Sequence, residues 1–216
     1  MRDLEQHRGA AGRAGWLRTA AQETLELAVE RHHPSLVMAC SFQKEESVLI
    51  DLVMQIEPRA RVFTIDTGVL FAETYATWRD IEERYGLAIE VVDATPANGT
   101  PWSASSCCGD RKVQALERAL AGNDAWVTGI RREQSPTRAD AQSVEWDERR
   151  GVSKFNPLVD WTAEDVWDYV HERELPYNPL HDSGYSSIGC APCTVPGNGR
   201  EGRWAGQNKT ECGLHA

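Results

Sequence analysis

Two kinds of apolar pattern alternate along the chain, one with helical periodicity and one of short continuous runs. Apolar residues at every third or fourth position predict helices over about 16–32, 48–56, 71–85 and 113–120. Short apolar runs predict buried strands at 36–40 and 61–65. Further strands are predicted at 88–92 and 125–128, with one more short strand at 154–158. Thr162 with Asp165 three residues later forms a capping-box pattern, which predicts that one more helix begins there.

The alternation of strands and helices predicts an α/β fold, with one parallel sheet and helices on both faces. Such sheets bind ligands beyond the carboxyl ends of their strands. The loops that follow the predicted strands are therefore candidate site segments: 41–46, 66–70, 107–112 and 129–138.

The elements divide the chain into one domain and a tail. Residues 1–196 carry every predicted element and are enough for a single domain with its own core. The last twenty residues, 197–216, hold five glycines and few apolar side chains. This composition predicts a mobile C-terminal tail.

Composition and charge narrow the function classes. The 216 residues carry a formal net charge of −10, which disfavours nucleic acid as a partner. We expect no membrane span, because no apolar stretch approaches about 18 residues. The N-terminus lacks the apolar region of a secretory signal, so we expect a cytoplasmic protein. An anionic small ligand would then need a local basic pocket.

Four of the six cysteines form two close pairs, Cys107-Cys108 and Cys190-x-x-Cys193. In a reducing cytosol such thiols more often bind metal than form structural disulfides. Four thiolates suit either zinc or a cubane iron–sulfur cluster, and adjacent cysteines favour the larger cluster. A thioredoxin-like redox pair at Cys190 and Cys193, and simple burial of the double cysteine, are the alternatives.

The two remaining cysteines differ in setting. Cys40 ends a predicted buried strand and is expected in the core. Cys212 lies in the glycine-rich tail, where Lys209 and His215 would favour the nucleophilic thiolate. The alternative is a tail thiol without a role.

Basic residues gather in the candidate loops although the whole chain is acidic. They follow the double cysteine, follow the fourth predicted strand, and recur in the tail: Arg111, Lys112, Arg131, Arg132, Arg138, Arg200 and Arg203. Guanidinium groups bind phosphate and sulfate through two parallel hydrogen bonds. The loop 41–47 stands where a phosphate loop would be but lacks its glycines. The missing glycines make an ATP-splitting site less expected than a site for a different anionic group. The alternative is that these basic residues belong to an ordinary solvated surface.

Taken together, these motifs resemble one family, the assimilatory sulfonucleotide reductases, and specifically the thioredoxin-dependent adenylyl-sulfate (APS) reductases. The matching stretches are Ser41-Phe42 with Glu45, Asp66-Thr67-Gly68 with Leu70-Phe71, Cys107-Cys108 with Arg111-Lys112, 129–135 with Thr137-Arg138, 154–157, 189–193, 202–204 and 211–215. The last of them, Glu-Cys-Gly-Leu-His, is highly specific together with the paired cysteines. The stretch 94–106 is shorter than the family pattern suggests.

The resemblance implies a Rossmann-like fold of the adenine nucleotide alpha-hydrolase type. It implies a 4Fe–4S cluster on Cys107, Cys108, Cys190 and Cys193, beside the substrate sulfate and linked to it electrostatically by Lys112. The cluster would not carry electrons. The remaining implied substrate contacts are Ser41, Phe42, Arg111, Gly129, Arg131, Arg132, Arg138, Arg200, Arg203 and His215.

The implied reaction belongs to assimilatory sulfate reduction, which supplies cysteine biosynthesis. The thiolate of Cys212 would attack the sulfur of APS, releasing AMP and leaving an S-sulfocysteine. Thioredoxin would then attack the sulfur of Cys212 and free sulfite.

Relatives that use the 3′-phosphorylated substrate (PAPS) usually lack both cysteine pairs, so the sequence favours APS. A PAPS or dual-substrate reductase and a zinc-stabilised nucleotide-binding module remain as alternatives. The sequence is compatible with a homo-oligomer.

Overall fold

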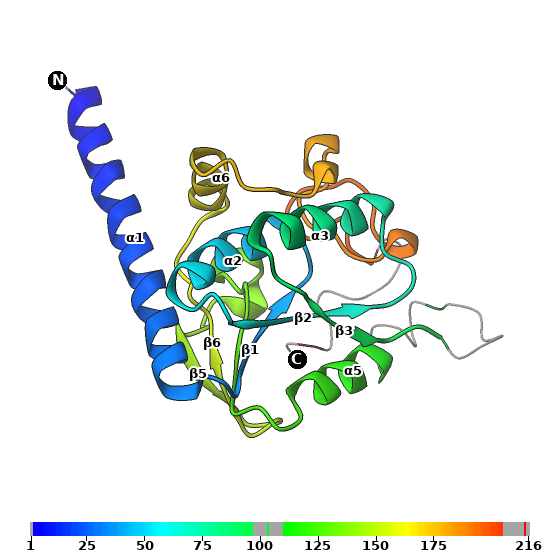
Figure 1. Ribbon diagram of the computed structural model, residues 1–216. Helices are drawn as coiled ribbons and strands as arrows, with labels where there is room; N and C mark the ends of the chain where they lie inside the picture. The colour runs from blue at the N-terminus through cyan, green and yellow to red at the C-terminus, as the bar shows by residue number, and fades with distance from the viewer. Residues whose placement is uncertain (1, 97–102, 104–109, 205–213, 215–216) are drawn as a thin grey trace.

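A computed structural model describes residues 2–96, 103, 110–204 and 214. Its centre is a six-stranded sheet in the order β3-β2-β1-β4-β6-β5 (Figure 1). Every neighbouring pair is parallel except β5 with β6. The strands are β1 (Leu36–Cys40), β2 (Arg61–Asp66), β3 (Glu90–Asp93), β4 (Ala125–Val127), β5 (Val144–Asp147) and β6 (Val152–Phe155).

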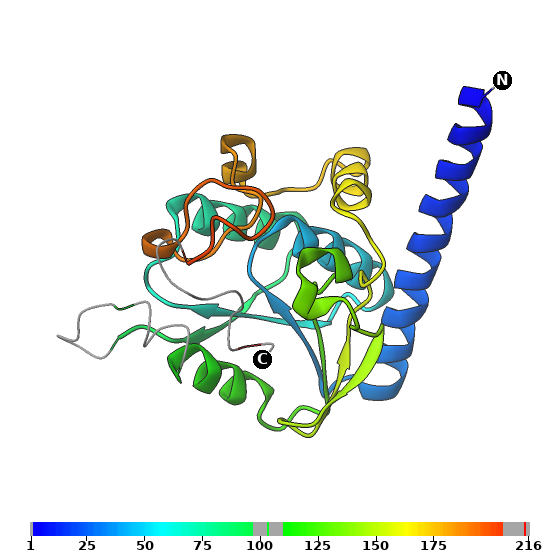
Figure 2. The ribbon, with the colours of Figure 1, turned by 180° about the vertical axis from the view of Figure 1, so that it is seen from behind.

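Helices cover the two faces of the sheet unequally, as Figures 1 and 2 show. The α-helices are α1 (Arg2–His32), α2 (Lys44–Ile56), α3 (Ala72–Tyr85), α5 (Lys112–Leu120) and α6 (Ala163–Glu172). The first three and α6 share one core with one face of the sheet. Within the described residues, α5 is the one helix whose core residues pack on the opposite face. The predicted fold class, with helices on both faces, is confirmed.

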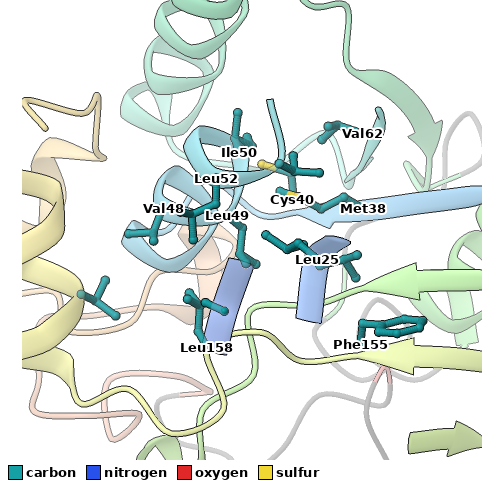
Figure 3. Packing of buried hydrophobic residues seen from close by; sticks show 14 of the residues in the cluster. Leu25, Met38, Cys40, Val48, Leu49, Ile50, Leu52, Val62, Phe155 and Leu158 are labelled. Carbon is teal, nitrogen blue, oxygen red and sulfur yellow. The ribbon is translucent and has the colours of Figure 1, made fainter. Parts of the chain in front are cut away.

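Alternation along the strands produces the two cores, since successive side chains of a strand point to opposite faces. Leu36, Met38 and Cys40 of β1 lie in the larger core, whereas Val37 lies in the smaller one with Trp126. Figure 3 shows Leu25 of α1 and the α2 leucines meeting Met38 and Cys40. Cys40 is 5% exposed, which confirms its expected place in the core.

The bounds of several elements differ from those predicted. Helix α1 begins at Arg2 rather than near residue 16, because the apolar stripe marks only the part of the helix that packs on the core. Strand β5 is absent from the prediction. Its exposed Val144 and Trp146 alternate with polar residues at the sheet edge, so no buried apolar run announces it. Strand β6 begins at Val152, two residues before the predicted strand.

Two predicted helix ends are confirmed. Gly86 follows α3 in the left-handed conformation, at φ 61°. The hydroxyl of Thr162 accepts a hydrogen bond from the backbone N–H of Asp165 at the start of α6.

The segment that follows Cys193 folds back on itself. The backbone N–H of Trp204 donates to the carbonyl of Cys193 at 2.8 Å, and that of Val195 donates to Gly202 at 2.9 Å. A Cβ atom at Gly202 would lie 2.1 Å from the Val195 carbonyl oxygen, so this crossing requires glycine. Trp204 is 1% exposed. Packing therefore extends to Trp204, past the predicted domain boundary at 196. Apart from Leu214, the tail beyond Trp204 lies outside the described residues, and its predicted mobility stays a prediction.

Candidate functional site

A cavity of about 480 Å³ opens at the carboxyl ends of β1 and β4. The strand order reverses direction between these two strands, and open α/β sheets bind ligands at such a switch point. The volume falls in the range of about 300–1,000 Å³ that small-molecule sites occupy. Its walls come from separate parts of the chain: 39–46, 63–65, 128–131, 186–189, and the side chains of Lys112, Arg200 and Arg203. All four candidate loops from the sequence therefore contribute, two of them through a single described residue each, Leu70 and Lys112.

The loop from β1 into α2 is fixed by hydrogen bonds at the helix start. The backbone N–H of Gln43 donates to Glu46 Oε2 at 3.0 Å, and the Gln43 side-chain oxygen accepts from the N–H of Ile188 at 2.9 Å. Phe42 has φ 58°, a strained conformation for a bulky residue. Its ring is fully buried and stacks on Trp78. This loop is thereby held against the segment that leads to Cys190.

A buried charge cluster stands beside the cavity. The Glu45 carboxylate accepts from Arg131 Nη2 at 2.8 Å and Nε at 3.0 Å, and lies 3.5 Å from Lys44 Nζ. Burial alone would raise the pKa of Glu45, but Lys44 and Arg131 outweigh it and the pKa falls to about 2. Arg131 Nη1 also donates to Glu133 and to the Trp161 carbonyl. Because these contacts occupy most of its guanidinium, Arg131 holds the loops together, and its predicted contact with substrate stays a prediction.

Glu46 is a second buried carboxyl in the cavity wall. Burial, and then the negative charge of Glu45, raise the pKa of Glu46 to about 7. The hydroxyl of Ser41 donates to its carboxylate at 3.2 Å. Gly129 lies directly against it, since a Cβ atom there would be 2.8 Å from Glu46 Oε1 and 3.1 Å from the Glu45 Cβ. Gly129 thus permits the close approach of the β4 loop to α2.

Arg203 lies across the segment that precedes Cys190. Its Nη1 donates to the Ser187 hydroxyl at 3.2 Å and to the Ile188 carbonyl at 3.1 Å. A Cβ atom on Gly189 would lie 2.7 Å from the guanidinium carbon, so the arginine rests on the bare glycine backbone. This contact keeps a cation at the cavity wall beside the cysteine loop.

Some of the predicted substrate contacts line the cavity and others lie outside its lining. Within the described residues, those that line the cavity are Ser41, Phe42, Lys112, Gly129, Arg131, Arg138, Arg200 and Arg203. Arg132 lies outside the lining, where it pairs with Asp160 and donates to the Ala141 carbonyl. Arg111 also lies outside it, and its buried Nε and Nη2 have no hydrogen-bond partner among the residues that the structure describes. His215 lies outside the described residues.

Cys190 and Cys193, the half of the predicted metal quartet that the structure describes, are 2% and 5% exposed. Cys190 forms a bridge with Leu70 and directly precedes a short 3-10 turn, Ala191–Cys193, which ends at Cys193. The hydroxyl of Thr67 is 3.2 Å from Cys190 Sγ. Two buried cysteines in one small cluster, with a hydroxyl group beside one sulfur, fit ligands of a thiolate-bound metal centre. Cys107, Cys108 and Cys212 lie outside the described residues.

Some wall residues were not among the candidates from the sequence. Trp167 and His181 line the cavity, with their rings 5.3 Å apart and perpendicular. Leu214 lines it as well. The aromatic spacing on α6 reads equally well as core, so the sequence does not separate Trp167 from ordinary packing. Leu214 stands in the matching stretch 211–215, which is the signal that could have found it.

None of the helices that the structure describes is long and apolar enough to cross a membrane.

Comparisons with known proteins agree on one family. The sequence profile described as "Phosphoadenosine phosphosulfate reductase domain" matches residues 35–196. The chain is 44% identical to the adenosine 5′-phosphosulfate reductase of Geobacillus kaustophilus, over 90% of this chain and 89% of that one. It is also 44% identical to the phosphoadenosine 5′-phosphosulfate reductase of Gloeobacter violaceus, over 93% and 90%. The crystal structure of phosphoadenylyl-sulfate (PAPS) reductase from Candida auris is similar with a TM-score of 0.69 and 28% identity, covering 81% of this chain and 90% of that chain.

Proposed function

The chain belongs to the phosphoadenosine phosphosulfate reductase domain family, and on that premise we propose that it is an APS reductase that makes sulfite through the thiol of Cys212. Relatives named adenosine 5′-phosphosulfate reductase support this oxidoreductase activity in sulfate assimilation. The choice of residues within the reaction rests on the chemistry of the cavity.

One observation carries the proposal: the cavity at the switch point gathers cationic side chains and Leu214 around the same space. Leu214 stands two residues after Cys212 in the sequence. Consecutive Cα atoms are about 3.8 Å apart, so the Cα of Cys212 is tethered within about 8 Å of that of Leu214. The tether supports a nucleophilic sulfur at the cavity.

The cationic side chains would bind and neutralise the sulfonucleotide. Lys112, Arg138 and Arg200 line the cavity together with Arg203. A thiolate approaches a sulfate group only when the charge on the sulfate oxygens is compensated, and preorganised cations also stabilise the charge that develops on the leaving phosphate. A small anion in an acidic protein is thereby drawn to this pocket.

The proposed transfer balances without an external oxidant. The Cys212 thiolate forms a bond to the APS sulfur, and the bond from that sulfur to the bridging oxygen breaks, its electron pair leaving with AMP. A thioredoxin thiolate then attacks Cys212 Sγ, which expels sulfite and leaves a mixed disulfide. The second thioredoxin thiol resolves it and restores Cys212. A dependence on reduced thiols fits a cytoplasmic location.

The cofactor part of the proposal is a 4Fe–4S cluster held by Cys107, Cys108, Cys190 and Cys193. Bound there, it would supply an electrostatic partner for the sulfate group beside Lys112. In the described part of the chain, Cys190 and Cys193 are buried in one small cluster, and the Thr67 hydroxyl lies beside the Cys190 sulfur. Iron and sulfide analysis after anaerobic purification tests this, with Cys193→Ser expected to lose both and the core variant Cys40→Ala expected to keep both. A colourless wild type with stoichiometric zinc would overturn the cluster.

The activity test measures sulfite released from APS with thioredoxin for wild type and Cys212→Ser. We expect release from the wild type alone, and persistent turnover in Cys212→Ser would remove Cys212 from the mechanism. PAPS serves as the competing substrate, because relatives are also named for it. A higher kcat/KM for PAPS would replace the APS proposal by a PAPS reductase.

A further inference from the structure

Leu214 occupies an apolar socket on the sheet face that α5 leaves partly uncovered. It packs against the smaller core, which includes Phe63, Leu116 and Trp126. It also packs against Trp204. These residues come from β2, α5, β4 and the segment that follows Cys193. A single leucine therefore joins the C-terminal end of the chain to four distant parts of the fold.

The socket is continuous with the cavity. Phe63, Leu116, Trp126 and Leu214 all line it, along with Lys112 at the start of α5. The cavity is thus lined by charged side chains near the β1 and β4 loops and by apolar side chains on the sheet face that carries α5. A nucleotide with several anionic groups fits the charged part, whereas the apolar part suits an aliphatic side chain.

Trp204 connects the socket to the cationic wall. The guanidinium carbons of Arg200 and Arg203 lie 5.3 Å and 4.9 Å from its ring centroid. Its backbone N–H donates to the carbonyl of Cys193. The residue that contacts Leu214 is therefore also in contact with two arginines of the predicted anion site.

We propose that Leu214 is a positioning residue that anchors the C-terminus in this socket and so keeps the reactive sulfur within reach of the bound substrate. The inference rests on the proposed function for the identity of that sulfur, Cys212. Leu214 touches no reacting atom. Its contribution is to raise the local concentration of the thiol at the cavity, since an anchored end samples far less volume than a free one.

The expected size follows from the apolar contact. Truncating Leu214 to alanine removes most of the side chain that fills the socket, which is only partly closed to solvent. We expect the equilibrium constant for docking to fall about tenfold, which corresponds to about 1.4 kcal/mol. Leu214→Met keeps the volume and apolar character, and should restore most of the effect.

The test is a single turnover with APS and no reductant, following the burst of AMP release in wild type, Leu214→Ala and Leu214→Met. We expect a burst rate about tenfold lower in Leu214→Ala, near-wild-type behaviour in Leu214→Met, and unchanged affinity for AMP. Leu87→Ala is the control, because Leu87 is a partly buried leucine of the larger core outside the cavity lining. Equal bursts in wild type and Leu214→Ala, an equal loss in Leu87→Ala, or a parallel loss of AMP affinity would overturn the anchor.

A second readout separates the anchor from the reaction. The rate at which iodoacetamide alkylates Cys212 in the presence of AMP is measured by peptide mass spectrometry, which needs no turnover. We expect alkylation to be several-fold faster in Leu214→Ala than in wild type, because an undocked thiol is more accessible. The absence of an AMP burst in wild type would refute the proposed function. Equal alkylation rates in wild type and Leu214→Ala would refute the anchoring role of Leu214 alone.

Discussion

Two carboxylates bind the same guanidinium in this fold but differ sharply in burial. Both Glu45 and Glu133 accept hydrogen bonds from Arg131, at 2.8 Å and 2.9 Å. The side chain of Glu45 is 4% exposed and that of Glu133 is 53% exposed. Removing the charge of one partner from a buried ion pair typically costs about 3–5 kcal/mol, whereas an exposed pair contributes at most about 1 kcal/mol. Glu45→Gln should therefore destabilise the protein far more than Glu133→Gln.

The lowered pKa of Glu45 reflects the same contacts with Lys44 and Arg131 and leads to a similar magnitude. A fall from 4.5 to about 2 corresponds to roughly 3 kcal/mol of stabilisation of the charged form. Because the folded-state pKa is lowered, this stabilisation is present above about pH 4.5 and is lost as the pH falls toward about 2. The difference in stability between wild type and Glu45→Gln should accordingly narrow at about pH 3.

Urea unfolding followed by tryptophan fluorescence measures both variants. At about pH 5.5, where Glu46 is largely protonated in the fold, we expect Glu45→Gln to lose roughly 3 kcal/mol. With a typical urea dependence of about 1–3 kcal/mol per molar, the midpoint should fall by about 1 M or more. Glu133→Gln should stay within about 1 kcal/mol of wild type. Similar losses in the two variants would refute the argument that burial makes Glu45 the essential partner of Arg131.

Three further predictions concern the cavity wall. Burial holds the pKa of Glu46 above that of the unfolded chain, so its stabilising contribution is complete below about pH 4.5 and lost as the pH rises through about 7. In Glu46→Gln, the urea midpoint should therefore depend less on pH over that range. A midpoint that changes with pH as steeply as in wild type would contradict the raised pKa. Gly129→Ala should lower the free energy of unfolding by about 1–3 kcal/mol in the same assay, because its Cβ would clash with Glu46. Gly12→Ala, whose Cβ would meet nothing within 4 Å, should leave stability unchanged or raise it. Equal effects of the two substitutions would contradict the clash. Gly189→Ala should displace Arg203 and weaken AMP binding measured by calorimetry about as much as Arg203→Ala does, and wild-type affinity would refute the close contact.

Much of the fold was predictable because the buried strands are uninterrupted apolar runs. The run 36–40 gives β1 with its exact bounds, and Gly86 and Thr162 mark their helix ends through local backbone chemistry. Strand β5 escapes prediction because its pairing with β6 is a tertiary contact and its apolar residues face solvent. The edge strand β3 was predicted from the apolar residues of 88–92 although it is largely exposed, so an apolar run in the sequence, rather than burial, decides which strands are predicted.

The candidate site was predictable in place but less so in detail. The loops after β1 and β4 meet because the topology brings them to the switch point. The sequence alone does not reveal that Arg131 is paired with Glu45, since the two are far apart in the chain. The sequence likewise does not distinguish Arg132 from Arg131, whereas in the fold Arg132 pairs with Asp160. Pairing between distant charges decides which arginines can meet a ligand.

The most direct test of the central claim is to identify the enzyme intermediate. Wild-type protein is mixed with APS without thioredoxin, quenched in acid, and digested for peptide mass spectrometry. The account predicts that one SO₃ group is attached to the peptide that contains Cys212, in equal amount to the AMP released. AMP and sulfite formed without any adduct on Cys212, or an SO₃ group attached to a different cysteine, would contradict it.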